Sequence, residues 1–225
     1  MVKRIPFLHL LAGFLALSAC SNRSLKRNAR VALLQGDGER AARFYEDALD
    51  RDPGDARLRR GLGEAWLLVA RDRSQDGDDK PSDWSRSARE LERGVSDTAS
   101  RRLLSEARLG MAKALARAGD TDQAVRGLEK ELDSDPRAIA ARNFLAILVD
   151  RRGEGDHAEE LFLQNAAIDS SDADAWFNLA LVEWGRGRRL EAADHMLHAS
   201  RLDPKDPEIL LWLERISKGL GGAEK

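Results

Sequence analysis

The sequence has little of what many folds need. Among its 225 residues there is one cysteine, one tyrosine and six prolines, and aromatic residues make up 5%. A single cysteine excludes an intramolecular disulfide, so the fold has to be stabilised by packing. Threonine stands only at 98 and 121, whereas Ala, Leu, Arg, Glu and Asp are abundant. This composition favours helices and disfavours strands.

An excess of charge of one sign is also missing. The chain has 37 Lys and Arg against 39 Asp and Glu, a formal net charge of -2. Without a basic excess or interleaved basic and aromatic residues, the chain does not read as a nucleic-acid binder. It also lacks a Gly-x-Ser-x-Gly elbow and a phosphate-binding glycine loop. We therefore expect neither an enzyme nor a small-molecule substrate. An enzyme would be supported by a hydrolase activity that survives purification and that a single polar substitution abolishes.

The N-terminus has no apolar run long enough to cross a membrane. A basic start, Met1 to Arg4, precedes a mostly apolar stretch from Ile5 to Leu17, and small residues follow. That stretch has about 13 residues, whereas a spanning helix needs about 20. A basic, an apolar and a small-residue region in this order are typical of a secretory signal. The alternative is a buried N-terminal helix.

The only cysteine directly follows Leu17, Ser18 and Ala19. This run resembles the lipobox of bacterial lipoproteins. The resemblance implies that residues 1–19 are a signal peptide removed before Cys20 and that lipid such as palmitate is attached to Cys20. It also implies that the mature chain is lipid-anchored in the cell envelope, since several acyl chains anchor stably. Ser21 then favours the periplasmic face of the outer membrane over the inner membrane. The alternative is an ordinary signal peptide with a chance cysteine.

A spacing of 34 residues runs through the rest of the chain. The same types of residue return at this interval in four stretches, with Ala and Gly at equivalent places: Ala29, Gly36, Ala41; Ala112, Gly119, Ala124; Ala146, Gly153, Ala158; Ala180, Gly187, Ala192. Self-similarity at a fixed period indicates a repeat architecture. The pattern resembles the tetratricopeptide repeat, which consists of two antiparallel helices.

The repeated residues have a physical explanation. Alanines on both helices of a unit let the two backbones approach closely, and Tyr45, Leu128, Phe162 and Met196 fill the space beside them. The glycines fall where the first helix ends and a left-handed residue is favourable. Prolines at 53, 136 and 204 end the second helix. We predict an all-α, helix-turn-helix solenoid of about five repeats plus a C-terminal capping helix.

The predicted units have the following boundaries. The repeat array covers 20–206, with units at 22–55, 56–101, 105–138, 139–172 and 173–206. The second unit carries an inserted loop at 72–83. A capping helix follows at 207–218, because the last repeat needs a neighbour to bury its apolar face, and we expect a flexible tail at 219–225.

The inserted loop has oxygen-bearing side chains at positions one, three, five and twelve: Asp72, Ser74, Asp76 and Asp83. With Gly77 at the sixth position, this spacing resembles the EF-hand calcium loop. The resemblance implies a Ca2+ site and a calcium-dependent binding module. Asp79 replaces the usual aliphatic residue at the eighth position, however, and Asp83 is shorter than the usual Glu. The alternative is a solvated acidic loop.

In the tetratricopeptide family, the first helices of successive units line a groove that binds peptides or partner helices. By register, the resemblance places these residues in the partner-binding groove: Lys26, Arg30, Arg57, Arg60, Asn143, Ile147, Phe177, Leu181 and Trp184. Such a groove would be basic early in the array and apolar late. The apolar cluster has two explanations, a partner's anchor or cover by the final helix.

These observations predict a lipid-anchored scaffold that binds other envelope proteins and assists assembly of a pilus, a secretion system or another envelope complex. The chain is similar in architecture to pilotins of type IV pilus secretins and to lipoproteins of tight-adherence pili. An adaptor for peptidoglycan enzymes is the alternative. Membrane contact is expected through the lipid anchor. Four basic residues would also be attracted to anionic headgroups: Arg23, Lys26, Arg27 and Arg30. The alternative is that these four belong to a solvated helix face.

Overall fold

The computed structural model describes residues 22–94 and 97–221, with side chains to Gly219. The predicted signal peptide, Cys20 and the last four residues therefore lie outside the described part. The described residues form helices and turns. They divide into two compact units, which we describe separately. Unit 1 ends at Ala118 and unit 2 begins at Gly119. The two helices of the repeat predicted at 105–138 therefore belong to different units.

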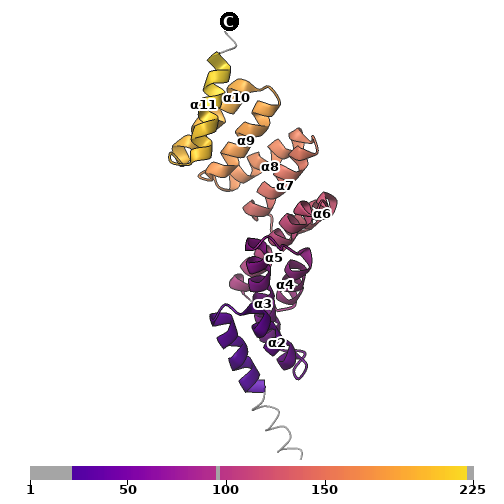
Figure 1. Cartoon of the computed structure of the whole chain (residues 1–225). Helices are drawn as coiled ribbons and strands as arrows, with labels where there is room; N and C mark the ends of the chain where they lie inside the picture. The colour runs from indigo at the N-terminus through magenta and orange to yellow at the C-terminus, as the bar shows by residue number, and fades with distance from the viewer. Residues whose placement is uncertain (1–21, 95–96, 222–225) are drawn as a thin grey trace, which may run out of the picture. The chain divides into compact units, whose positions relative to one another are not determined.

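The described part of unit 1 consists of a helix at 22–34 followed by four helices that pack in sequence (Figure 1). These are α2 (Gly38–Leu49), α3 (Ala56–Gln75), α4 (Pro81–Gly94) and α5 (Thr98–Arg117). Each packs against the next, α2 against α3, α3 against α4 and α4 against α5.

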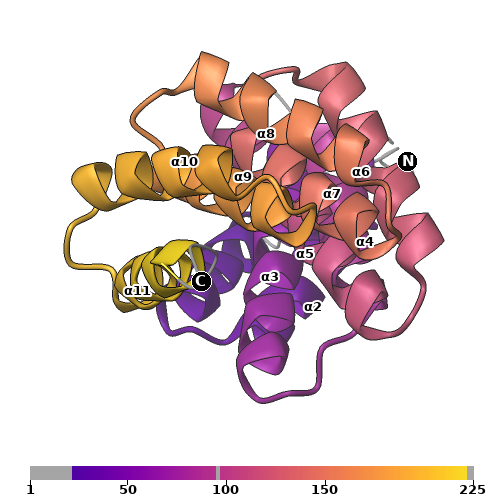
Figure 2. The ribbon, with the colours of Figure 1, turned by 90° about the horizontal axis from the view of Figure 1, so that it is seen from above.

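Unit 2 begins with α6 (Thr121–Ser134) and α7 (Ile139–Arg151), followed by α8 (Gly155–Ile168) and α9 (Ala173–Gly185). It ends with α10 (Arg189–Leu202) and α11 (Pro207–Gly221). The starts of α7, α9 and α11 are each 34 residues apart, so α11 occupies the place of a first helix. Figure 2 shows it alongside α10, against which it packs.

Aspartates begin many of these helices. Asp37, Asp55, Asp97, Asp120 and Asp172 each accept a hydrogen bond from a backbone N–H in the first turn. Such caps satisfy donors that have no partner within the helix, each contributing about 1 kcal/mol.

Glycines end the first helices as predicted. The φ angles of Gly36, Gly119, Gly153 and Gly187 lie between 77° and 88°. At Gly36 the turn closes with Asp37 N donating to Ala32 O at 2.9 Å. This 6→1 bond is the Schellman pattern, in which a residue without Cβ avoids a steric penalty.

The alanines predicted to face one another are all buried, with at most 1% of their surface exposed. Tyr45, Leu128, Phe162 and Met196 are buried beside them. Small residues at the helix contact and large ones next to it explain how two antiparallel helices pack closely without a void.

Two boundaries differ from the sequence prediction. Helix α3 continues to Gln75 and α4 begins at Pro81, so the connection is only 76–80 instead of 72–83. The capping helix extends to Gly221, beyond the predicted end at 218. Within the described ranges, no helix is both long and apolar enough to cross a membrane.

Candidate partner-binding surface

The basic end of the predicted groove lies in unit 1 and is partly neutralised. Lys26 Nζ lies 2.6 Å from Asp55 Oδ2. Arg60 donates to Glu64 Oε1 and to Asp97 Oδ2, each at 2.8 Å. Arg30 and Arg57, in contrast, are exposed. Only part of the predicted positive charge is therefore available to a partner.

The calcium loop is a prediction that the structure contradicts. Asp72 and Ser74 lie within α3, and Asp83 lies within the first turn of α4. Asp83 is buried, and Arg73 Nη1 donates to its Oδ2 at 2.6 Å. In the described part of the chain, no group of three or more acidic, His or Cys residues could hold a metal ion. Helical backbone at the first two ligand positions and an arginine on the last prevent the EF-hand geometry.

Phe177 is also not a groove residue. Its side chain is only 8% exposed and belongs to an apolar cluster with Met196 of α10 and with Ile209 and Ile216 of α11. The sequence left two explanations for the apolar residues late in the array, a partner's anchor or cover by the final helix. At Phe177, cover by the final helix is correct.

Leu181 and Trp184 are half-buried against the same cluster. A Cβ at Gly219 of α11 would lie 2.5 Å from the Trp184 ring, so the absence of a side chain lets α11 approach α9 closely. Arg189 lies over the Trp184 ring at 5.5 Å from its centroid, a cation–π contact. Trp184 is therefore largely engaged within the unit, and Leu181 is likewise only partly exposed.

Asn143 on α7 is partnered. Its Oδ1 accepts a hydrogen bond from the buried amide of Asn165, whose Nδ2 also donates to Ile139 O at 3.2 Å. Arg142 Nη1 donates to Asn165 Oδ1 at 2.9 Å, and burial lowers the pKa of Arg142. This polar network links α7 to α8, so Asn143 has a structural role. Ile147, one turn further, stays half-buried.

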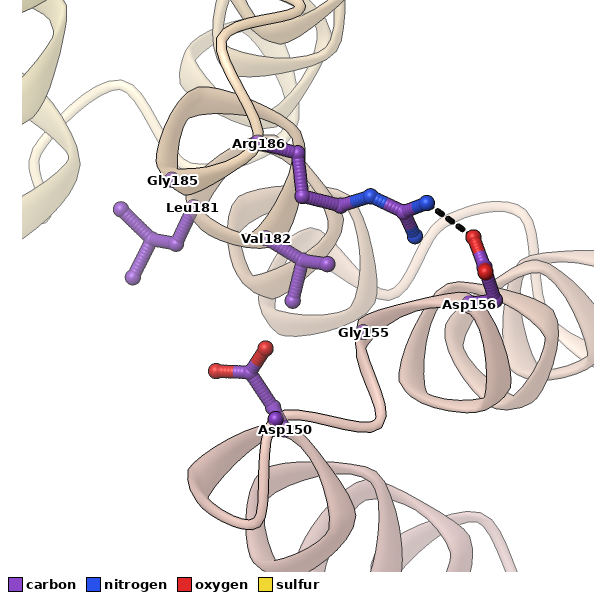
Figure 3. Close-up of a pocket in the computed structure, with 8 residues that line it drawn as sticks. Asp150, Gly155, Asp156, Leu181, Val182, Gly185 and Arg186 are labelled. Carbon is purple, nitrogen blue, oxygen red and sulfur yellow. Dashed lines mark hydrogen bonds and ion pairs between the residues drawn. The ribbon is translucent and has the colours of Figure 1, made fainter.

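A hollow of about 330 Å³ lies between the ends of α7 and α9 and the start of α8 (Figure 3). Leu181 and Val182 form its apolar wall, and Asp150 points toward it from α7. Arg186 on the other side is held by the carboxylates of Asp156 and Glu159. Asp150 is exposed and makes no ion pair with any residue that the structure describes.

The first helices α7, α9 and α11 carry the residues of one surface of unit 2; in the 34-residue register Ile147 corresponds to Leu181 and Asp174 to Glu208. Its apolar members are Ile147, Leu181 and Leu211, and its acidic members are Asp150, Asp174 and Glu208. We call these six residues the unit 2 first-helix surface. The helices that carry them are neighbours, because Asp150 and Leu181 line one hollow and Gly219 meets Trp184. Leu211 is 47% exposed.

The acidic part of this surface is electrostatically strained. Burial, together with the neighbouring carboxylates of Asp172, Asp206 and Asp203, raises the pKa of Asp174. Like charges that are held close together favour the neutral form. A cation placed among them would relieve this repulsion.

A family model for the tetratricopeptide repeat matches residues 27–71 and 109–173. The matched segments contain the buried alanines and the left-handed glycines of three of the four regular repeats: Ala29, Gly36 and Ala41; Ala112, Gly119 and Ala124; Ala146, Gly153 and Ala158.

The chain has the tetratricopeptide-repeat fold.

Several solved structures share this fold. MamA is 20% identical with a TM-score of 0.59, covering 84% of this chain and 94% of MamA. A tetratricopeptide-repeat protein from Parabacteroides merdae is 16% identical with a TM-score of 0.62, covering 89% and 74%. YrrB, whose structure is described as having an unusual peptide-binding site, is 18% identical with a TM-score of 0.56, covering 83% and 88%. No protein with a curated description matches the chain significantly.

Asp150, Asp174, Glu208 and Leu211 are not among the residues that the repeat register predicts for the groove. A signal was present, since Leu211 stands 34 residues after Phe177, and Asp174 and Glu208 are also 34 apart. By this equivalence α11 is a first helix with its own inner face, in addition to capping the array.

Proposed function

We propose that this tetratricopeptide-repeat chain is an envelope scaffold, anchored by lipid at Cys20, that binds a basic segment of an envelope protein on the unit 2 first-helix surface. The observation that carries the binding proposal is the exposure of Leu211 on a surface whose carboxylates, Asp150, Asp174 and Glu208, form no ion pair with the residues that the structure describes. Aromatic and apolar anchors surrounded by a charged rim are typical of binding sites.

The expected partner follows from the chemistry of the surface. Leu211, Leu181 and Ile147 offer apolar contact, and Asp150, Asp174 and Glu208 offer negative charge. A segment with one apolar anchor and flanking Lys or Arg residues complements both features. The YrrB description supports peptide binding as a use of this fold. Components of a pilus or secretion assembly are the candidates that the lipoprotein resemblance favours.

A photo-crosslinking experiment tests this proposal. A photoreactive amino acid replaces Leu211 or Leu181 in the full chain, in cells of the native host. We expect both positions to trap the same envelope protein. Leu190 is the matched control, because it is a leucine of the same unit that is 71% exposed on α10.

Charge reversal provides the second arm. Asp174→Lys together with Glu208→Lys should reduce the Leu211 crosslink at least about tenfold, since each rim charge contributes to steering and specificity. An equal crosslink at Leu190, or an unchanged yield after charge reversal, would show that the partner binds elsewhere.

A further inference from the structure

The helix at 22–34, dark indigo in Figure 1, forms one end of unit 1 and has an unusual outward face. Five residues on it are exposed: Arg23, Arg27, Arg30, Val31 and Leu34. At 100° per residue, all five fall within an arc of about 100° that runs the length of the helix. We call this arc the N-terminal stripe.

The stripe is basic and apolar without any acidic residue. Leu34 is 89% exposed and Val31 46%. The opposite side of the helix buries Ala29 and Ala32 against α2 and α3. Arg23, Arg27 and Arg30 form no ion pair with any residue in 22–94 or 97–221. Lys26 lies outside the stripe and is paired with Asp55.

Repeat geometry explains why this face is open. Positions 27 and 31 correspond, 34 residues on, to Gly61 and Ala65 of α3. At these positions α3 packs tightly on α2. A Cβ added to Gly61 of α3 would lie 2.4 Å from the Tyr45 ring of α2, and a Cβ added to Gly38 of α2 would lie 2.9 Å from the backbone oxygen of Ala65 in α3. In helix 22–34 the same positions carry arginine and valine, and no described helix covers them.

We propose that the N-terminal stripe docks on an anionic lipid surface. Three arginines complement acidic headgroups, and Val31 and Leu34 can enter the interface between headgroups and acyl chains. Basic residues on one face with apolar residues between them are typical of helices that lie in the membrane plane.

The position of Cys20 strengthens the proposal, and this step rests on the lipid anchor of the proposed function. Only Ser21 lies between Cys20 and the first described residue of the helix, so the two are at most about 7 Å apart along the chain. An acylated Cys20 would therefore hold the helix at headgroup level. Docking of the stripe would then orient unit 1 end-on to the bilayer.

A single fluorescent label at Leu34 tests the proposal without requiring acylation. The full chain carries Cys20→Ser and Leu34→Cys, so the label has one attachment site. It is titrated with vesicles of phosphatidylcholine alone or of phosphatidylcholine with phosphatidylglycerol. We expect a blue shift and rising intensity that saturate at lower lipid concentration with the anionic vesicles. The same label on Leu190→Cys should not respond to lipid charge.

Charge removal then separates stripe docking from general attraction. Replacing Arg23, Arg27 and Arg30 by Gln should raise the half-saturating lipid concentration about 100-fold, because each arginine near such a surface contributes about 1 kcal/mol and 1.4 kcal/mol is tenfold. The matched control replaces Arg89, Arg101 and Arg102, three exposed arginines of the same unit, by Gln. This control should change the half-saturating lipid concentration little.

Each opposing outcome has a distinct meaning. The proposal that the stripe docks on anionic lipid would be overturned if the label at position 34 responded equally to both vesicle types. It would also be overturned if the control variant lost as much lipid affinity as the stripe variant. A Leu34 label that is already shielded without vesicles would show that another part of the chain or a second protein covers the stripe, and would also overturn it. Absence of lipid on Cys20 in cells would reject the anchor and leave this measurement valid.

Discussion

Single residues in this chain carry distinct roles that the repeat pattern alone does not separate. Glycines that look alike in the sequence are either close-contact positions or free ones, aspartates either cap helices or repel one another, and one cysteine stands apart from the array. Substitutions at individual positions distinguish these roles.

Replacing Cys20 tests the anchor. Cys20→Ala should abolish incorporation of labelled palmitate and leave the precursor uncleaved at position 19, because lipoprotein processing requires the thiol. Metabolic labelling and gel mobility measure both effects. Soluble, unacylated wild-type protein in the periplasm would contradict the prediction.

Two helical glycines predict opposite effects on stability. A Cβ at Gly110 of α5 would lie 2.2 Å from the Trp84 ring, whereas at Gly127 of α6 it would meet nothing within 4 Å. Gly110→Ala should lower stability by about 1–3 kcal/mol through overpacking, and Gly127→Ala should raise it by about 0.5–1 kcal/mol. Chemical denaturation of both variants measures the difference, and equal effects would show that the α4–α5 contact is looser than described.

Asp174 predicts a pH-dependent effect. Its raised pKa means that the carboxyl favours the folded state most below its ordinary pKa of 3.8, and that this contribution is lost as the pH rises through the folded-state value. Asp174→Asn removes the charge. The variant should therefore melt at a higher temperature than the parent at neutral pH, and the difference between the two melting temperatures should decrease toward acid pH. A lower melting temperature at neutral pH would refute this assignment.

At the scale of elements, α11 has two faces with different tasks. Its inner face closes the apolar cluster around Phe177, and its outer face belongs to the surface where we expect a partner. A repeat array needs such a terminal element because the last pair of helices cannot bury its apolar side alone.

Substitutions on the two faces of α11 should separate stability from binding. Ile216 is 1% exposed, so Ile216→Ala should cost about 2–5 kcal/mol. Leu211→Ala should change stability by less than about 0.5 kcal/mol, as for other surface positions, and should reduce partner crosslinking at Leu181. Loss of folding in Leu211→Ala would place this residue in the core and remove it from the binding surface.

At the scale of the whole molecule, charge is distributed unevenly along the chain. Residues 22–118 contain 21 Lys and Arg against 17 Asp and Glu, whereas residues 119–225 contain 14 against 22. The nearly balanced total therefore conceals a basic first part, next to the proposed anchor, and an acidic second part that carries the proposed partner surface.

This asymmetry predicts salt-sensitive partner binding. In isolated membranes, the crosslink formed at Leu211 should weaken as the ionic strength rises, because the screening length falls from about 10 Å at 0.1 M to about 3 Å at 1 M. Crosslink yield measured over a salt series checks this. A yield that is independent of salt would indicate a partner held by apolar contact alone.

The repeat pattern determined most of the fold. The 34-residue spacing of alanines and glycines placed the paired helices and predicted the left-handed turns at Gly36, Gly119, Gly153 and Gly187. These features are local or repeated in sequence: a glycine that ends a helix acts within one turn, and an alanine faces the neighbouring helix at a fixed interval. The sequence also contained every residue of the N-terminal stripe at helical spacing.

The tertiary structure decided which repeated positions remain accessible. Phe177 and Leu211 occupy equivalent places in the repeat. Phe177 is buried in the cluster that α11 closes, whereas Leu211 is exposed, because no further helix after α11 is among the described residues. Likewise, Asp83 has the spacing of a calcium ligand but is paired with Arg73, since helices α3 and α4 bring the two together. Burial and pairing depend on neighbours distant in sequence, and a pattern along one chain segment does not contain them.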